Sequence, residues 1–262
     1  MIYTISHADI PAHAFPDTFH HVIPQSFYAR QNTEVEWLTD GEENFACYHK
    51  NTGFCLTGSV QTTLLSWAQW LYDHRITLLA GERSLHFRLL QTLGTLGSEA
   101  AQEILCRFEF QELCVHNTPL QALTTNLQIK RAERVDAEKL FYFYKRSETM
   151  EARSQESLRQ TIAQDKLIYI HKMGKILSAA LTHCETPDTA LIGGVYTPVA
   201  YRGKGYAKAC VHALMSALKA EQKIPCLFYE QNNQAARALY KSLGFTPYGE
   251  WLIAELIYPT PA

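Results

Sequence analysis

A glycine-rich turn between an apolar segment and an amphipathic helix constrains this fold more than any other stretch. The apolar segment, residues 189–195, is rich in strand-forming side chains, and the turn that follows it contains Gly203 and Gly205. Beyond the turn, apolar residues lie at positions 207, 210, 211, 214, 215 and 218, which is the spacing of one helix face. The turn therefore joins a strand to a helix N-terminus, which presents unpaired N–H groups and a partial positive charge. We interpret it as an anion site that holds a pyrophosphate.

Composition limits the classes of protein to which this chain can belong. Its 262 residues suffice for one large domain or two ordinary ones, and 47% hydrophobic with 19% charged residues is typical of a globular protein. The 24 basic and 26 acidic residues nearly cancel, so charge gives no support for a nucleic acid or an anionic membrane as partner. The start of the chain has no basic segment followed by an apolar block, and we expect a cytoplasmic protein.

Cysteines and histidines give no support for a metal site or a disulfide framework. The seven cysteines are odd in number and scattered, and none forms a C-x-x-C pair. Adjacent His20 and His21 would point to different sides of a strand or helix, so they are poorly placed to share an ion. We expect buried, reduced thiols and no metal.

The first half of the chain alternates strand and helix patterns and contains no chemical motif. We predict strands over 45–49, 54–56, 76–80 and 104–115, helices over 61–72 and 85–96, and a short helix and strand within 25–38. The turn at 81–84 follows a strand and is a weak second anion candidate. The turn-rich residues 116–119 open a linker that extends to about Asn126. We therefore predict an N-terminal α/β domain over 1–125, with no assigned function, and a second domain over 126–262.

The second half shows a longer series of elements around the glycine-rich turn. We predict strands over 127–132, 166–171, 175–182, 189–197, 226–229 and 250–257, of which the second and third form a hairpin. Helices are predicted from Asp136 to Tyr144, from Ser154 onward and over 207–220. A last helix is capped by Asn233 and is ended by Gly244.

Two familiar phosphate-binding turns do not fit the residues. A P-loop requires Ser or Thr after its Gly-Lys pair, but Lys204 is followed by Gly205, so the hydroxyl that holds magnesium is missing. A dinucleotide fingerprint would use Gly203 and Gly205, but its third glycine position is Lys208, whose bulk prevents close helix–strand packing. Nucleotides bound with magnesium and dinucleotides are therefore disfavoured as ligands.

A third pattern, [Gln/Arg]-x-x-Gly-x-[Gly/Ala], matches residues 202–207, Arg-Gly-Lys-Gly-Tyr-Ala. It resembles the coenzyme-A turn of the GNAT superfamily of N-acetyltransferases. Residues 233–245 resemble the second signature of that superfamily, N-x-x-A-x-x-L-Y-x-x-x-G-F, and the strand–helix–helix–hairpin order from Leu127 resembles the start of its fold. Two signatures in the right order and at the right distance make the resemblance specific over about 127–257.

The resemblance implies a mixed sheet in which two central parallel strands, 189–197 and 226–229, splay apart around the pantetheine arm of acetyl-CoA. The backbone of Val195 and Thr197 would pair with pantetheine, and N–H groups from Gly203 to Lys208 would hold the pyrophosphate. The glycines would let the phosphates approach the backbone. The residues thus implied in binding acetyl-CoA, the co-substrate, are Val195, Tyr196, Thr197, Arg202, Gly203, Lys204, Gly205, Tyr206, Ala207, Lys208 and Asn233.

The resemblance also suggests catalytic residues. Tyr240 is similar to the family tyrosine that protonates the departing thiolate, and a phenol is acidic enough for that role; the alternative is core packing on the helix stripe. The general base is unresolved. Glu230, just after the fifth strand, is the nearest candidate, and a solvated loop carboxylate is the alternative. Glu185 and His183 could also reach the acceptor side.

These observations predict an N-acetyltransferase that acts on a primary amine, by direct transfer in a ternary complex. The acceptor would be a small-molecule amine or amino-acid-like compound, with neither nucleic acid nor membrane as partner, and a homodimer is left open. The N-terminal domain either caps the acceptor site or is a degenerate GNAT-like half. The alternative class is a non-catalytic acyl-CoA-binding or sensing module.

Overall fold

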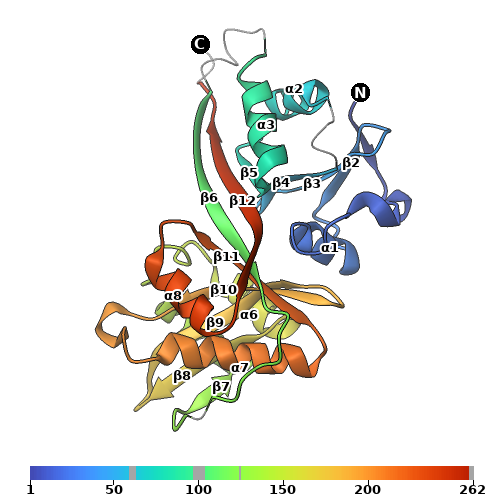
Figure 1. The fold of residues 1–262 in the computed structure, drawn as a ribbon. Coiled ribbons are helices and arrows are strands. Elements are labelled where there is room, and N and C mark those ends of the chain that lie inside the picture. Colours follow the sequence, from blue (N-terminus) through green and yellow to red (C-terminus); the bar gives the residue numbers. More distant parts are fainter. Residues whose placement is uncertain (59–62, 97–103, 124, 260–262) are drawn as a thin grey trace. The chain divides into compact units, whose positions relative to one another are not determined.

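The chain divides into two units, each of which contains segments from distant parts of the sequence. The computed structural model describes residues 1–58, 63–96, 104–123 and 125–259 (Figure 1). The first unit comprises Met1–Leu113, Glu230–Asn232 and Tyr248–Ala262, and the second comprises Cys114–Tyr229 and Asn233–Pro247. Strands β6 (Leu105–Val115) and β12 (Thr246–Ile257) each contribute residues to both units. The assignment of separate functions to residues 1–125 and 126–262 stays a prediction.

The first unit is a sheet with the strand order β1-β2-β3-β4-β5-β12-β6. Its helices and single turns of 3₁₀ helix come from the N-terminal part of the chain. The strands are β1 (Tyr3–Ile5), β2 (Glu36–Thr39), β3 (Phe45–His49), β4 (Gly53–Thr57) and β5 (Leu78–Glu82), and the helical elements are η1 (His7–Asp9), η2 (Ala12–Ala14), α1 (Val22–Ala29), α2 (Leu65–Asp73) and α3 (Arg83–Leu93). Strands β3 and β4 form an antiparallel hairpin in which Cys47 lies opposite Cys55.

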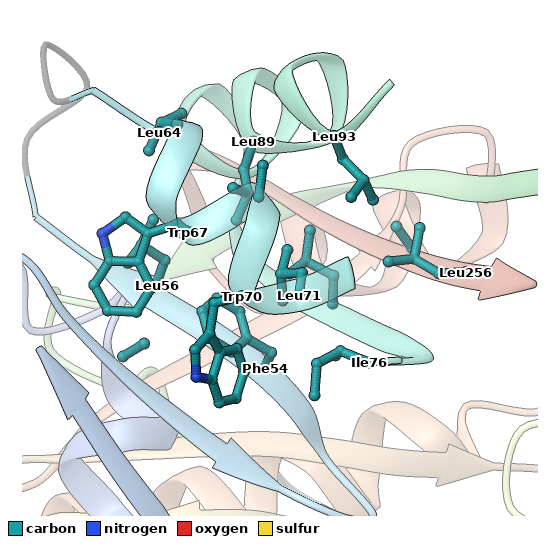
Figure 2. Close-up of a cluster of buried hydrophobic side chains, with 14 of the residues drawn as sticks. Phe54, Leu56, Leu64, Trp67, Trp70, Leu71, Ile76, Leu89, Leu93 and Leu256 are labelled. Carbon is teal, nitrogen blue, oxygen red and sulfur yellow. The ribbon is translucent and has the colours of Figure 1, made fainter. Parts of the chain in front are cut away.

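Helices α2 and α3 cover this sheet with an apolar face. Figure 2 shows Trp67 and Trp70 of α2 beside Phe54 of β4, and the ring centroids lie 6.0 and 5.7 Å from that of Phe54. Leu89 and Leu93 of α3 belong to the same buried cluster. Burial of large aromatic and aliphatic side chains is the main favourable term in folding, so this cluster stabilises the first unit.

The turn at 81–84 binds its own carboxylate. Glu82 is the N-cap of α3, and its side chain accepts hydrogen bonds from the N–H groups of Ser84 at 2.9 Å and Leu85 at 2.8 Å. A capping carboxylate satisfies the N–H groups that an external anion would need. The weak second anion candidate of the sequence is therefore a helix cap.

The second unit contains the glycine-rich turn and has the strand order β6-β11-β10-β9-β8-β7. Strands β10 and β11 are parallel, while β9 is antiparallel to both of its neighbours. The strands are β7 (Ile129–Arg131), β8 (Leu167–Lys172), β9 (Lys175–Glu185), β10 (Thr189–Tyr196) and β11 (Ile224–Glu230), and the helical elements are η3 (Arg134–Asp136), α5 (Ala137–Tyr144), α6 (Gln155–Gln164), η4 (Val199–Tyr201), α7 (Tyr206–Ala220) and α8 (Gln234–Ser242). The sheet is therefore mixed, as expected.

Alternate residues of β8 and β9 pack against different helices. Ile168 and Ala180 belong to the buried cluster that includes the inner face of α7, whereas Leu167 and Leu181 belong to the cluster of α5 and α6. Since successive side chains of a strand point to opposite faces, α7 covers one face of the sheet, and α5 and α6 cover the other (Figure 1). The two faces of this sheet therefore lie against different helices.

Several boundaries differ from the sequence predictions. Helix α2 begins at Leu65, and residues 61–62 of the predicted helix lie outside the described residues. Strand β12 begins at Thr246 and not at 250. Strand β11 begins before the predicted 226 and includes Pro225. The Pro225 carbonyl accepts the His116 N–H at 3.0 Å, and the missing N–H of the proline does not interrupt the pairing with β10.

In the part of the chain that the structure describes, no helix combines the length and apolar character needed to cross a membrane.

Two buried histidines of the first unit must remain neutral for the fold to be stable. His86 is fully buried; its Nε2 accepts the Leu56 N–H at 3.0 Å, while Nδ1 lies 2.9 Å from the Glu82 carbonyl. His21 is also buried, and its Nδ1 accepts the Asp17 N–H at 3.1 Å. Burial lowers the pKa of each to about 4, from an ordinary value of 6.5.

These pKa values predict a loss of stability in mild acid. Below pH 6.5 the unfolded chain takes up protons that folded His21 and His86 do not, so the free energy of unfolding decreases from about pH 6.5 towards pH 4. The expected loss at pH 5 is about 2 kcal/mol for each histidine. Urea unfolding at pH 7 and pH 5 measures it. The His21→Asn variant should show a smaller difference in unfolding free energy between the two pH values, whereas the His13→Asn control, at an exposed histidine, should not. Equal stability of the wild-type protein at both pH values would contradict the prediction.

Candidate functional site

The parallel strands β10 and β11 are paired only at their beginnings. Their register runs from Thr189 opposite Ile224 to Ile192 opposite Leu227, whereas β10 continues to Tyr196. Within the described residues, no pairing between these strands continues beyond Ile192. The edge of β10 that would face β11 is therefore available over residues 193–196, which is the splay that the sequence resemblance implies.

A bulge in β10 occurs at the same place. Gly193 pairs with Leu181 of β9, but the next pair joins Tyr196 to Ala179, and Gly194 has φ of +54°. A Cβ on Gly193 would stand 2.1 Å from Cδ2 of His183, and one on Gly194 would stand 2.8 Å from Cγ of Leu181. Side chains of β9 therefore leave no room for a Cβ at either position. At Gly194 the left-handed backbone is a second reason for glycine.

The turn after β10 is held by local hydrogen bonds. The hydroxyls of Thr197 and Ser178 lie 2.8 Å apart, and Arg202 Nε donates to the Thr197 carbonyl at 3.0 Å. Gly203 and Gly205 have φ of +75° and +77°, and Gly205 is the N-cap of α7. A Cβ on either glycine would meet no heavy atom within 4 Å, so the backbone of the turn borders open space.

This geometry suits the approach of an anion. The Gly205 carbonyl accepts the Ala209 N–H at 3.0 Å, so the N–H groups of Tyr206, Ala207 and Lys208 precede the first helical hydrogen bond. Arg202 and Lys204 are exposed on the same turn and add positive charge. A negatively charged group can therefore approach the N-terminus of α7 without a steric obstacle and with favourable electrostatics.

The second signature forms a complete helix with both caps. Asn233 accepts the Ala236 N–H at 3.0 Å at the start of α8. At its end Gly244 has φ of +87°, its N–H donates to the Lys241 carbonyl, and the Phe245 N–H donates to the Tyr240 carbonyl, each at 3.1 Å. These bonds make a Schellman motif, which fixes the end of α8 as the sequence predicts.

Tyr240 lies on the inner face of α8 between two other rings. Its side chain is 7% exposed, and its ring centroid lies 5.6 Å from that of Tyr229 and 5.9 Å from that of Phe245. Burial, with a smaller contribution from neighbouring Cys114, raises the pKa of Tyr240 above its ordinary value. Tyr240 is therefore a neutral phenol at physiological pH, and it both packs the core and carries a proton.

The three candidate bases have different surroundings. Glu230 is exposed at the end of β11 and belongs to the first unit. Glu185 is buried and accepts hydrogen bonds from Lys166 at 2.8 Å and Lys223 at 2.6 Å; burial opposes ionisation, but these bonds lower its pKa. That carboxylate is a structural ion-pair partner. His183 is exposed as a residue, but its ring packs against the Cα of Gly193, and burial of the ring, with a smaller contribution from Arg153, lowers its pKa to about 4.

The structure adds residues that sequence reasoning missed. Tyr144 of α5 donates from its hydroxyl to the Gly194 carbonyl at 2.8 Å, and Tyr196 donates to the Arg146 carbonyl at 2.6 Å. The side chain of Tyr196, expected in the coenzyme site, thus turns to the loop between α5 and α6. Nothing in the local sequence marks these contacts, because each joins residues that are distant in the chain.

Among the described residues there is no group of three or more His, Cys, Asp or Glu side chains placed to hold a metal.

A mixed sheet with parted parallel strands, followed by a left-handed glycine turn at a helix N-terminus, defines an acyl-CoA N-acyltransferase fold of the GNAT type. Residues 172–252 match the GNAT-related family described as FR47-like protein. The recognition of a GNAT fold from the two signatures is thereby confirmed. No curated protein sequence matches the chain.

Solved structures of this class match nearly the whole chain. A GCN5-related N-acetyltransferase from Sphaerobacter thermophilus is 15% identical, with coverage of 100% of this chain and 96% of the other and a TM-score of 0.67. A GNAT-family acetyltransferase from Colwellia psychrerythraea is 15% identical, with coverage of 98% and 99% and a TM-score of 0.60. A GCN5-related N-acetyltransferase-like protein from Streptococcus suis is also 15% identical, with 96% of each chain covered and a TM-score of 0.61. These likenesses confirm the fold.

The turn can be tested with a matched pair of glycine substitutions. Gly205 and Gly174, in the β8–β9 hairpin, have φ of +77° and +75°, and a Cβ on either meets no heavy atom within 4 Å. Gly205→Ala and Gly174→Ala should therefore cost the same stability, about 1–2 kcal/mol. Only Gly205→Ala should weaken coenzyme-A binding, by about tenfold or more, because its methyl group lies where the phosphates approach the backbone. Calorimetry with coenzyme A measures the affinity; equal affinities of the two variants would refute the assigned turn.

Proposed function

We propose that this protein is an acyl-CoA-dependent N-acyltransferase that transfers an acetyl group from acetyl-CoA to a primary amine in a ternary complex. The observation that carries the proposal is the parting of β10 and β11 after Ile192, directly before the left-handed turn at Gly203 and Gly205. An open strand edge suits the amides of pantetheine, and a helix N-terminus suits a pyrophosphate. A coenzyme-A thioester carries both groups.

In the proposed donor complex, the backbone of Val195 and Thr197 pairs with pantetheine as an added strand would. The N–H groups from Gly203 to Lys208 bind the pyrophosphate, and Arg202 and Lys204 add charge at the rim. Asn233 caps α8 and contributes a further contact to the coenzyme. Tyr196, Tyr206 and Ala207 complete the proposed set through their backbone.

The proposed reaction is a direct acyl transfer. The neutral amine attacks the thioester carbonyl, the C–S bond breaks, and the sulfur leaves as a thiolate. Tyr240 donates its phenolic hydrogen to the developing thiolate, which stabilises the negative charge on the sulfur. A proton from solvent restores the phenol once coenzyme A leaves as the thiol. A base removes the proton that the amine nitrogen loses. This chemistry forms no covalent intermediate on the protein.

Glu230 and His183 compete for the role of base. Glu230 is the proposal from the sequence. His183 is favoured by a specific contact, because its ring lies against Gly193, where β10 leaves β11. A neutral imidazole at that point can accept a proton from an amine that approaches the thioester.

Single variants distinguish the two bases. We expect His183→Asn to lower kcat by about 100-fold, as loss of a general base does, and Glu230→Gln to change it less than about threefold. Steady-state release of free coenzyme A measures kcat. The opposite pattern would restore Glu230 as the base, and equally small effects would point to a water chain or to an amine that arrives neutral.

The alternative function is a module that binds acyl-CoA without transfer. Tyr240 separates the two functions, because a binding module needs only the packing of its ring. For an enzyme, Tyr240→Phe should lower kcat by about 100-fold while acetyl-CoA affinity stays within about threefold. Acetyl-CoA consumption across a panel of amines, with calorimetric affinity as the control, measures both. Tight binding without turnover on any amine, and no effect of Tyr240→Phe, would favour the module.

We further propose a small-molecule amine or amino-acid-like acceptor and a cytoplasmic location. The near balance of charge gives no attraction to nucleic acid or to an anionic membrane.

A further inference from the structure

The peptide between Gly194 and Val195 lies outside the regular pairing of its sheet. In the part of the chain that the structure describes, the register of β10 with β9 skips both residues. On the other edge of β10, the pairing with β11 extends only as far as Ile192. Residues in a bulge are left out of the ladder of hydrogen bonds, so another contact has to fix the orientation of this peptide.

The hydroxyl of Tyr144 supplies that contact. It donates from α5 to the Gly194 carbonyl at 2.8 Å, and Tyr144 is only 1% exposed. Burial raises the pKa of this phenol, so the hydroxyl keeps its proton and remains a donor. Tyr144 is itself packed in the buried cluster that includes Leu158 of α6 and Ala179 of β9. The ring therefore has a fixed place, from which the hydroxyl selects one orientation of the peptide.

The geometry of a peptide bond extends this contact to the next residue. The peptide is trans and planar, so its C=O and N–H groups point in opposite directions. Because the Gly194 carbonyl points to Tyr144, the Val195 N–H points away from Tyr144 and from the cluster of α5 and α6. This N–H is one of the backbone groups that the proposed donor complex uses.

We propose that Tyr144 is a positioning residue for the donor substrate, and that its hydroxyl holds the Gly194–Val195 peptide so that the Val195 N–H can donate to pantetheine. This inference rests on the proposed function, in which the open edge of β10 binds coenzyme A. A peptide that is oriented before the ligand arrives loses less conformational freedom on binding, which increases affinity. Tyr144→Phe keeps the ring but leaves the Gly194 carbonyl without this donor, so the orientation of the peptide is no longer fixed.

Paired ligands and variants test the proposal by calorimetry. Coenzyme A is compared with adenosine 3′-phosphate 5′-diphosphate, which is coenzyme A without its pantetheine arm. Tyr144→Phe should weaken coenzyme-A binding about fivefold, as the loss of one neutral hydrogen bond does, and should leave binding of the shortened ligand unchanged. Gly205→Ala should weaken both ligands, because they share the pyrophosphate.

Tyr169→Phe is the matched control. It removes a hydroxyl that is buried in the same cluster and makes no hydrogen bond to β10 among the described residues. Its affinity for both ligands should equal that of the wild-type protein. Equal affinities of Tyr144→Phe and Tyr169→Phe for coenzyme A would overturn the proposal. A loss of the same size for both ligands in Tyr144→Phe would also overturn it, since Tyr144 would then only support the fold.

Amide hydrogen exchange gives a second measurement, which the wild-type protein alone can fail. Saturating coenzyme A should slow the exchange of the Val195 N–H at least about tenfold in the wild-type protein, and less in Tyr144→Phe. Lack of protection at Val195 in the wild-type complex would overturn the proposal even if Tyr144→Phe did not fold. Failure of the wild-type protein to bind coenzyme A at all would overturn the proposed function instead.

Discussion

The structure depends most on the bulge at Gly193 and Gly194, where β10 turns away from β11. A parallel pair that continued to the end of β10 would occupy its own edge with backbone hydrogen bonds. The bulge prevents this, since Gly194 adopts a left-handed backbone and the Tyr144 hydroxyl holds its carbonyl. The unpaired edge that results is the feature around which the anion turn and the loop before α6 are arranged.

The two faces of the second unit hold different chemical groups. Helix α7 packs on one face, and its N-terminus presents free N–H groups beside exposed Arg202 and Lys204. Helices α5 and α6 pack on the other face, and their connecting loop accepts a hydrogen bond from Tyr196. Both helices and loop meet the same strand, so a ligand that lies along the open edge of β10 can be contacted from both faces. This arrangement suits a reaction between two substrates that must approach one another from different sides.

Local sequence patterns predicted the elements whose geometry is set within a few residues. The cap at Gly244 and the N-cap at Asn233 follow from backbone preferences and short-range hydrogen bonds. The β8–β9 hairpin follows in the same way, because Met173 and Gly174 adopt positive φ angles that match strand twist. Predictions were weaker where long-range packing decides the outcome, as at Pro225, whose place inside β11 depends on pairing with β10.

The sequence by itself determined the turn at 202–207, the helix signature at 233–245 and therefore the kind of fold, because these depend on glycine conformations and helix spacing. It also offered Tyr240 as a proton donor, and no local pattern distinguished that role from packing. Only the tertiary structure decided that Glu82 caps its own helix, that Glu185 is held by two lysines, and that the Tyr144 hydroxyl holds the Gly194 carbonyl. Those properties depend on which side chains from distant segments come within a few ångströms, and burial and charge compensation are set by that proximity alone.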